Sequence, residues 1–380
     1  MSAIGSATRE VARSRRKARK SDLGAALILG GPAFILLLVF LIGPFFLGIW
    51  FSFTDQRLVS PKPAEFVGTR NYSRLLQMAV LTLDPVVDPA TKQPQKDVNG
   101  QIQYPRSREF TRDEQKFPQY FGLTEWFSVD FGNHRYVVLA GDPTFLHSII
   151  NNIFFAIVVV PVQAGLGLLL ALLVNQKLRG RNFFRTIYFS PVVTSMVVIS
   201  IVWTFLYEKN VGLMNQFLKT LSFGSLGPVD WLGDPNTAMW AIIIMSVWQG
   251  VGLQMILFLA GLQQIPDQLY EAADIDGANP LQKFRYITWP GLSSVTVFIL
   301  ITITIAAFQL FTQVFVMTNG GPNGATSTVA FEMVQKGFRE QDIAYASAIS
   351  VIFFLFILAI SLVQRYLTRS QEGKVKVKKS

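Results

Sequence analysis

The chain has 380 residues, of which 51% are hydrophobic and only 15% are charged, and its mean hydropathy is +0.37. Soluble globular domains carry about 25% charged residues, so this composition excludes an ordinary soluble domain and indicates an integral membrane protein. The net charge of +10 could suggest a nucleic-acid partner. Because the basic residues gather beside apolar runs, topology signals and contacts with anionic membrane lipid explain the charge better, and we expect no nucleic acid.

Several kinds of chemistry are excluded by the residues that are missing. The chain has no cysteine, hence no disulfide or thiol chemistry. Its two histidines, His134 and His147, stand far from any acidic cluster, so we expect no metal site. No GxxxxGK[ST] phosphate loop occurs, and we therefore expect the chain to bind no ATP and no other cofactor of its own.

Six stretches contain no Asp, Glu, Lys or Arg, namely 23–54, 143–176, 186–207, 235–266, 286–331 and 343–364. Each exceeds the roughly 20 residues that a helix needs to cross a bilayer. The pattern predicts an all-α integral membrane protein with six transmembrane helices, at about 24–53, 145–174, 184–207, 236–262, 290–316 and 344–366.

The basic residues beside these helices predict the orientation, because short cytoplasmic segments carry an excess of Lys and Arg. Nineteen Lys and Arg residues lie in the two tails, in the loop after the second helix and in the loop after the fourth, whereas the two short loops on the other side hold four. Both termini and the loop after the fourth helix are therefore expected in the cytoplasm, with the protein in the cell (inner) membrane.

The predicted organisation in chain order begins with a basic cytoplasmic tail at 1–21 and the first transmembrane helix at 22–54. An exterior segment at 55–144 follows, and it opens with Phe66-Val67-Gly68-Thr69-Arg70-Asn71-Tyr72. A five-helix core at 145–367 includes a cytoplasmic loop at 263–290, and a second basic tail closes the chain at 368–380. Polar, Pro-containing sequence within 73–144 reads as loop, and the aromatic residues around it suffice for a small packed subdomain.

Neutral polar residues are scattered among the predicted helices, whose charge-free stretches contain no Asp, Glu, Lys or Arg. Ser246, Gln249, Gly250 and Leu253 follow helical spacing on one face of the fourth helix. Gln309 and Gln313 repeat the four-residue spacing on the fifth helix, and Ser195 lies in the third. Amide and hydroxyl side chains beside aromatic rings suit a sugar, so these residues are candidates for a substrate path. The alternative is that they hydrogen-bond between helices, as such residues often do in membranes.

The loop between the fourth and fifth helices reads EAADIDGANPLQKFRYITWP at 271–290. Pro266 and Asp267 suit the start of a helix, and Gly277 is placed to end it in a left-handed conformation. Pro280 can then start a second short helix. We therefore expect two short helices joined by a bend, stiff enough to transmit force. A solvated helical hairpin without a partner is the plainer alternative. After the fifth helix, Thr318-Asn319-Gly320-Gly321-Pro322 predicts a tight exterior turn.

The loop resembles the EAA loop of permease subunits in binding-protein-dependent ABC importers, with Trp289-Pro290 in place of the usual Leu-Pro. The 66–72 stretch and the TNGGP turn resemble markers of the carbohydrate permeases, and the exterior insertion is placed as in the larger permease of maltose-type importers. The resemblance implies the type I importer architecture. It also implies ATPase-coupling roles for residues of the loop, namely Glu271, Ala272, Ala273, Asp274, Gly277, Ile287 and Pro290.

The same resemblance implies a transmembrane subunit of an ATP-driven sugar importer that is not itself an enzyme. Its partners would be a second permease subunit, two ATPase subunits that bind ATP and Mg, an exterior solute-binding protein, and the carbohydrate substrate. The alternative function is a secondary carrier or channel for a neutral polar solute. The absence of Asp, Glu, Lys and Arg from the six charge-free stretches argues against coupling to protons or sodium. An intramembrane enzyme is disfavoured because no catalytic constellation is evident.

Overall fold

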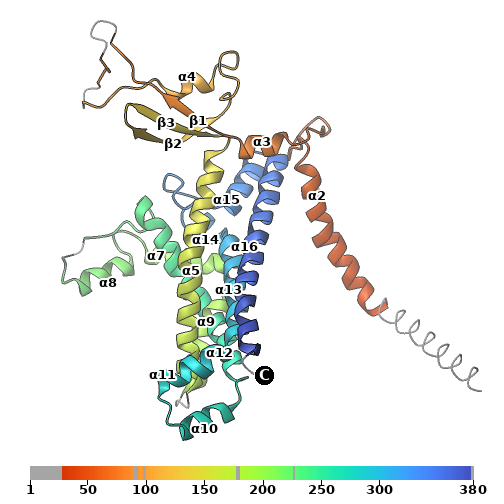
Figure 1. Ribbon diagram of the computed structural model, residues 1–380, viewed down its shortest axis with the longest axis vertical. Helices are drawn as coiled ribbons and strands as arrows, with labels where there is room; N and C mark the ends of the chain where they lie inside the picture. Colours follow the sequence, from red (N-terminus) through yellow and green to blue (C-terminus); the bar gives the residue numbers. More distant parts are fainter. Residues whose placement is uncertain (1–27, 89–92, 97–99, 177–179, 226, 378–380) are drawn as a thin grey trace, which may run out of the picture.

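The computed structural model describes residues 28–88, 93–96, 100–176, 180–225 and 227–377, and the predicted tail at 1–21 lies outside them. The chain forms a bundle of long helices with a small β-sheet at one end and a short helical hairpin at the other (Figure 1). The last helix ends at the hairpin end of the bundle. The β-sheet and the helical hairpin are thus separated by the full length of the bundle.

Within the described residues, five helices are long and apolar enough to cross a membrane, and a bent pair of helices makes a sixth candidate. This count agrees with the six predicted spans. The five are the first helix Ile28–Phe51, which includes π-helix η1 (Leu38–Ile42) and α2 (Gly43–Phe51); α5 (Pro143–Asn175); α9 (Pro235–Leu262); Ser293–Met317, formed by α13 (Ser293–Phe308) and α14 (Thr312–Met317); and Ile343–Tyr366, the apolar part of α16 (Ile343–Val377).

Two long core helices, α5 and α9, begin with the same pair of residues, an aspartate followed by a proline. Asp142 accepts a hydrogen bond from the Phe145 N–H at 3.0 Å, and Asp234 accepts one from the Asn236 N–H at 2.8 Å. An N-cap carboxylate satisfies a helix N–H that has no partner inside the helix, and proline at the next position needs no such partner. The starts of α5 and α9 are therefore specified locally.

The predicted third helix, 184–207, is wrong as a single straight span. The chain forms α6 (Arg181–Val193) and α7 (Met196–Leu206), and their axes bend by 99° at the break. Thr194 and Ser195 are extended, with ψ of 142° and 131°. Pro191, which lies inside the last turn of α6, lacks an N–H and its ring crowds the carbonyl four residues earlier, so the helix is weakened just before it ends. A loop with α8 (Leu213–Leu221) then leads to α9.

The fifth span is also interrupted, between α13 and α14, at residues 309–311. Gln309 and Gln313 lie on either side of this break, so they do not share a face of one continuous helix as predicted. Side chains satisfy the carbonyls that the break frees: the Thr328 hydroxyl donates to the Leu310 carbonyl at 2.7 Å, and the Asn152 amide reaches the carbonyls of residues 307 and 308 at 3.4 Å. Such partners are what permit non-helical backbone at membrane depth.

Close approach of α9 to its neighbours depends on glycine. A Cβ at Gly252 would lie 2.0 Å from the Tyr188 carbonyl oxygen of α6. A Cβ at Gly250 would lie 1.8 Å from the Gln163 Nε2 of α5. The Gln163 amide donates to the Ser246 carbonyl at 3.1 Å, so one polar contact joins α5 and α9 inside the buried core. Small residues at helix crossings are the usual means of close packing in membranes.

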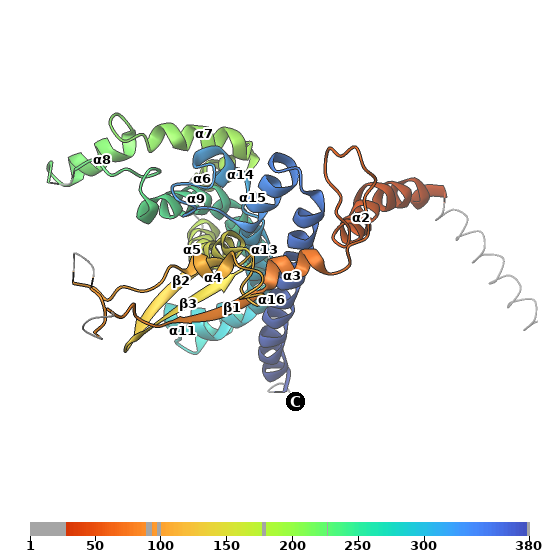
Figure 2. The same cartoon turned by 90° about the horizontal axis from the view of Figure 1, so that it is seen from above.

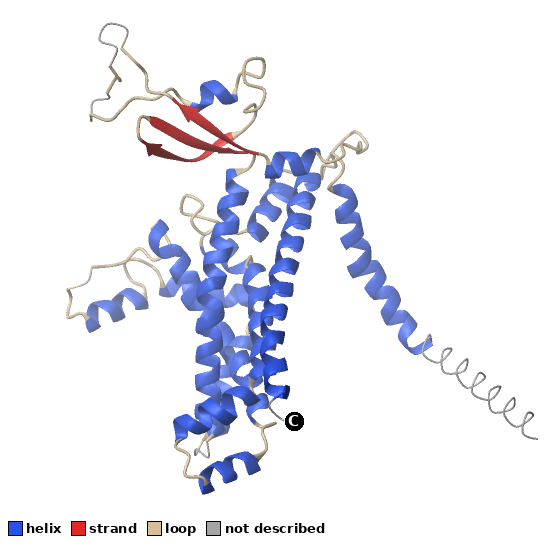
Figure 3. Ribbon diagram, viewed as in Figure 1, coloured by secondary structure: helices blue, strands red, loops and turns tan. Residues whose placement is uncertain are grey.

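The exterior segment contains a sheet that the sequence did not predict (Figure 3). Strands β1 (Met78–Leu83), β2 (Thr124–Phe131) and β3 (His134–Ala140) pair antiparallel in the order β1-β3-β2, with α4 (Ser107–Thr111) beside them. The predicted packed subdomain does form: one face of the sheet has its own small core, with Tyr104, Phe110 and Tyr120 packed against Leu81, Leu83, Leu123, Val137 and Leu139.

Polar contacts fix the exterior segment to the bundle. The Tyr345 hydroxyl of α16 donates to Asp142 at the start of α5, at 2.7 Å. Burial alone would raise the pKa of Asp142, but hydrogen bonds from Thr144, Tyr345 and the Phe145 N–H outweigh it and leave that pKa below its usual value. Asn71 in α3 (Arg70–Leu76) donates to the carbonyls of Ser52 and Thr54.

The chain between α14 and α16 forms the predicted turn and then two short helices. Asn319 and Gly320 adopt positive φ angles of 50° and 82°, as a tight turn requires. The helices are α15 (Val329–Val334) and the π-helix η3 (Gln335–Arg339), and α15 packs against both α5 and α16. The sheet end of the bundle is therefore closed by packed chain.

We predict that Gly252→Ala destabilises the protein because its new methyl group meets backbone, which cannot move aside as a side chain can. Overpacking costs about 1–3 kcal/mol, against a gain in helix propensity of about 1 kcal/mol. Gly165→Ala on α5 is the matched control, since a Cβ there meets nothing within 4 Å. Thermal unfolding in detergent should show a lower Tm for Gly252→Ala and an equal or higher Tm for Gly165→Ala. Equal melting of both variants would show that α6 and α9 do not approach this closely.

Candidate functional site

The loop after α9 forms the predicted pair of short helices, α10 (Asp267–Ile275) and α11 (Pro280–Lys283). Gly277 lies between them with a φ of +72°, the left-handed conformation that glycine adopts without strain. Asn279 and Gln282 form a reciprocal capping box, with hydrogen bonds of 2.8 and 2.9 Å, and Pro280 occupies the first position of α11. Gly277, Asn279 and Pro280 thus each contribute to the bend between the two helices.

Two side-chain contacts make the α10–α11 hairpin stiff. The hydroxyls of Tyr270 in α10 and Thr288 in π-helix η2 (Phe284–Thr288) lie 2.9 Å apart and share a hydrogen bond. Lys283 in α11 forms an ion pair with Asp274 in α10. The hairpin then joins the membrane core through α12 (Trp289–Gly291), where a Cβ at Gly291 would lie 2.8 Å from Ile265. A displacement of the hairpin would therefore be transmitted directly to α9 and α13, the helices that precede and follow it.

The outer surface of the hairpin is exposed. Of the residues predicted to couple to an ATPase, Glu271, Ala272, Asp274 and Gly277 are exposed, whereas Ala273, Ile287 and Pro290 are half-buried. Ile287 packs against the membrane core, so it supports the hairpin from behind.

Three apolar side chains on the same segment were not singled out in the sequence: Ile275 (87% exposed), Leu281 (74%) and Tyr286 (71%). Apolar residues inside a short, charge-bearing loop are the signal that could have identified them. Large exposed apolar side chains grouped beside charges are typical of a protein–protein contact.

The candidate substrate-path residues on α9 differ in their surroundings. Ser246 is buried, and its hydroxyl has no hydrogen-bond partner in the described part of the chain. Gln249 is half-buried, and Leu253 is 41% exposed. Gly250 is closed off by Gln163 and acts as a packing residue. The four therefore share a helix face, as predicted, but only Gln249 combines a polar group with partial exposure.

The other three candidates lie on separate elements. Ser195 is exposed at the bend between α6 and α7, Gln309 is exposed at the break in the fifth span, and Gln313 is half-buried on α14. No hydrogen bond joins any two of the seven candidates within the described ranges. The structure does not bring them into one preformed polar cluster within this single chain.

A cavity of about 380 Å³ opens beside the bend of α6 and α7. Its lining is largely apolar, with Ser190, Thr194 and the rings of Trp203 and Trp248, whose centroids lie 5.5 Å apart, among Ile187, Pro191, Val198, Ile199 and Val202. Hydroxyl groups and aromatic rings in one lining suit a hydroxyl-rich solute. Trp248 precedes Gln249 on α9, and Gln249 itself is not among the residues that line this cavity.

Comparison with known proteins agrees with this architecture. Residues 163–373 match the family described as "Binding-protein-dependent transport system inner membrane component". A probable ABC transporter permease protein, YurN of Bacillus subtilis, is 36% identical over 252 residues, covering 64% of this chain and 86% of that relative. The trehalose/maltose transport system permease protein MalF of Thermococcus litoralis is 32% identical over 354 residues, covering 92% and 95%.

The fold is also shared with a solved structure. A bacterial ABC transporter involved in the import of the acidic polysaccharide alginate contains a chain that superposes with a TM-score of 0.64 at 18% identity, over 94% of this chain and 99% of that one. The six-span architecture is thus that of an ABC importer permease. Taken with the family match over residues 163–373, the chain belongs to the binding-protein-dependent transport system inner membrane components.

Proposed function

We propose that this protein is a transmembrane permease subunit of an ATP-driven carbohydrate importer, and that the α10–α11 hairpin couples it to an ATPase subunit. The observation that carries the proposal is the hairpin itself: a stiff, exposed element joined directly to α9 and to the fifth span. ATP and Mg would be bound by the partner. Among the described residues, no three His, Cys, Asp or Glu side chains are grouped so that they could hold a metal ion.

The hairpin has the surface that such a partner would need. Ile275, Leu281 and Tyr286 supply apolar area, and Glu271 places a carboxylate on the exposed side of α10. Buried apolar anchors with charges around them are the common composition of protein interfaces. The distribution of Lys and Arg along the chain favours a cytoplasmic hairpin and cytoplasmic termini.

A second permease subunit is supported by the first helix. None of its most apolar window is buried, whereas 22–56% of the corresponding windows in the other four continuous spans is buried. Figure 2 shows this helix standing apart from the bundle on the side away from α8. A transmembrane helix with so few contacts inside its own chain is explained if it packs against a neighbouring subunit.

An exterior solute-binding protein is supported by the outer sheet. One face of the sheet covers its small core, and the pairing register places Val80, Phe127, Val129, Phe131 and Tyr136 on the opposite face. These side chains are 37–77% exposed. An exposed apolar sheet face is a candidate protein contact. The plainer alternative, an insertion without a partner, leaves this apolar surface unexplained.

A carbohydrate substrate is supported by both the site and the relatives. The relatives include proteins named for the transport of trehalose and maltose, arabinooligosaccharides and lactose. In this chain, the cavity beside the bend of α6 and α7 combines two hydroxyl side chains and two tryptophan rings with five apolar residues, and no charged side chain lines it. A neutral, hydroxyl-rich solute fits this lining. We place the sugar path along the side of α9 that carries Trp248 and Gln249.

We predict that Gln249→Leu reduces sugar uptake about five- to tenfold, the effect expected when one or two neutral hydrogen bonds to substrate are lost. Assembly with the ATPase and basal ATP hydrolysis should persist, because Gln249 has no hydrogen-bond partner within the described chain. Thr302→Val is the matched control: the Thr302 hydroxyl donates only to carbonyls of its own helix. Uptake assays in cells and hydrolysis assays in proteoliposomes give the two readouts. Normal uptake by Gln249→Leu would remove this residue from the path.

We further predict that Glu271→Lys and Ile275→Asp each weaken retention of the ATPase subunit about tenfold or more, since each places an unfavourable charge in the contact. Both residues are exposed, so membrane insertion should be normal. Glu114→Lys, an equal charge change in the exterior segment, is the control. Co-purification and binding-protein-stimulated ATP hydrolysis are measured together. The proposed coupling role is refuted if both hairpin variants retain the ATPase and transport at the wild-type rate.

A further inference from the structure

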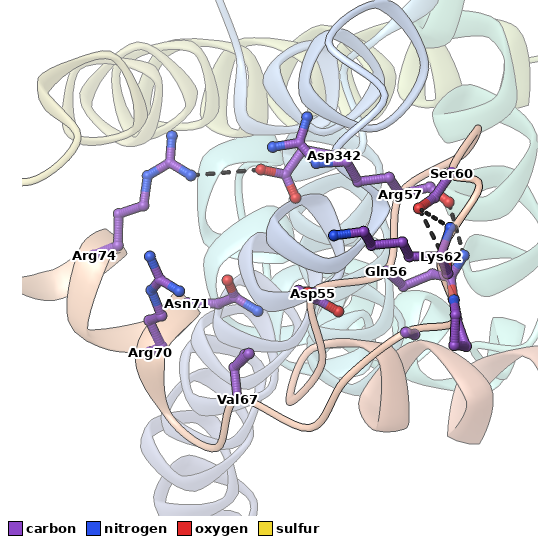
Figure 4. Close-up of a pocket in the computed structure, with 12 residues that line it drawn as sticks. Asp55, Gln56, Arg57, Ser60, Lys62, Val67, Arg70, Asn71, Arg74 and Asp342 are labelled. Carbon is purple, nitrogen blue, oxygen red and sulfur yellow. Dashed lines mark hydrogen bonds and ion pairs between the residues drawn. The ribbon is translucent and has the colours of Figure 1, made fainter.

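A basic pocket lies at the exterior end of the bundle, between the end of α2 and the start of α16 (Figure 4). It encloses about 320 Å³ and belongs to neither the hairpin nor the sugar path. Arg57 and Lys62 extend toward it from the loop after α2, and Arg70 and Arg74 rise from α3.

The charges in this pocket do not cancel. Its lining holds four cations and two carboxylates, Asp55 and Asp342. Asp342 is occupied by Arg74 at 3.4 Å and by the Tyr345 N–H at 3.0 Å, and Asp55 accepts from the Glu65 N–H at 2.7 Å. In the described part of the chain, Arg57, Lys62 and Arg70 have no acidic partner within 4.0 Å. The pocket therefore presents unpaired donors suited to a phosphate or carboxylate.

An apolar groove of about 390 Å³ lies between the same two helices, deeper in the predicted membrane. On α16 it begins five residues after Asp342 and continues to Leu355, and on α2 it is lined from Pro44 to Ile49. At a rise of about 1.5 Å per residue, the groove extends from about 8 to 20 Å below the basic pocket. Its lining includes Phe45, Gly48, Val351 and Phe354.

We propose that the pocket and groove together bind one anionic glycerophospholipid from the leaflet at this end of the bundle. The basic pocket would hold the phosphate headgroup, and the groove below it would hold an acyl chain. A free anion would account for the cations but not for the groove, and an apolar helix of a partner subunit would account for the groove but not for the cations. Only a lipid combines a net negative head with an apolar chain at this spacing. Bound there, it would join the first helix to α16.

The test uses the full-length protein purified in detergent and incubated with phosphatidylglycerol or phosphatidylcholine, with bound lipid counted by native mass spectrometry. The wild type should retain phosphatidylglycerol preferentially. Arg57→Ala combined with Arg70→Ala should reduce that retention about tenfold or more, because two charge-assisted contacts are lost. Arg108→Ala combined with Arg112→Ala is the matched control, since both arginines are exposed and lie outside the pocket, and it should retain lipid as the wild type does.

A second pair of variants tests the groove. A Cβ at Gly48, in the groove, or at Gly31, elsewhere on the same helix, meets nothing within 4 Å. Gly48→Phe should lower retention of phosphatidylglycerol, and Gly31→Phe should not. Equal retention by Gly48→Phe, or complete displacement of lipid by inorganic phosphate, would show a site for free anions and overturn the proposal. Loss of bound lipid on assembly with a second subunit would assign the groove to that subunit and overturn it equally.

Discussion

The exclusion of charge from the hydrocarbon core of the membrane is the constraint on which this structure depends. Each of the six charge-free stretches lacks Asp, Glu, Lys and Arg across its apolar length, as expected because a charged side chain at the centre of a bilayer is costly. Inside the bundle, the amides of Gln163 and Asn152 and the hydroxyl of Thr328 donate hydrogen bonds to backbone carbonyls. The charged residues lie toward the two ends of the bundle. A conformational signal between these ends would have to travel through the movement of packed helices.

The two ends of the bundle are built differently. At the hairpin end, short helices joined at Gly277 are braced by the Tyr270–Thr288 hydrogen bond and carry the exposed side chains of Ile275, Leu281 and Tyr286. At the exterior end, Asp142 connects the start of α5 to α16 through Tyr345. Between them, α9 packs so closely on α5 and α6 that a Cβ at Gly250 or Gly252 would clash. Close packing of this kind makes α9 suited to transmit a displacement of the hairpin to the proposed sugar path.

Much of the fold could be predicted from sequence because its determinants are local. Charge-free windows predict the spans, an aspartate followed by a proline marks the starts of α5 and α9, and Gly277 with Pro280 marks the bend of the hairpin. The bend in the third span and the break in the fifth could not be predicted. The bend follows Pro191, but hydropathy does not distinguish a bent span from a straight one. The break depends on a distant partner, because Thr328 satisfies the Leu310 carbonyl, and hydropathy does not report such a contact. The sheet was missed because the polar, Pro-containing sequence between its strands was read as loop, and because β2 is exposed along most of its length.

The candidate site was only partly predictable for the same reason. The bend of the hairpin could be predicted because its glycine and capping residues are neighbours in sequence, whereas exposure of Ile275 and Leu281 is known only from the folded chain. The central claim, that this hairpin docks an ATPase, is tested most directly by placing a photo-crosslinking amino acid at Leu281 in cells that express the whole transporter. The account predicts a crosslink to the nucleotide-binding subunit. A crosslink only to an exterior protein, or none in a complex that retains the ATPase, would contradict it.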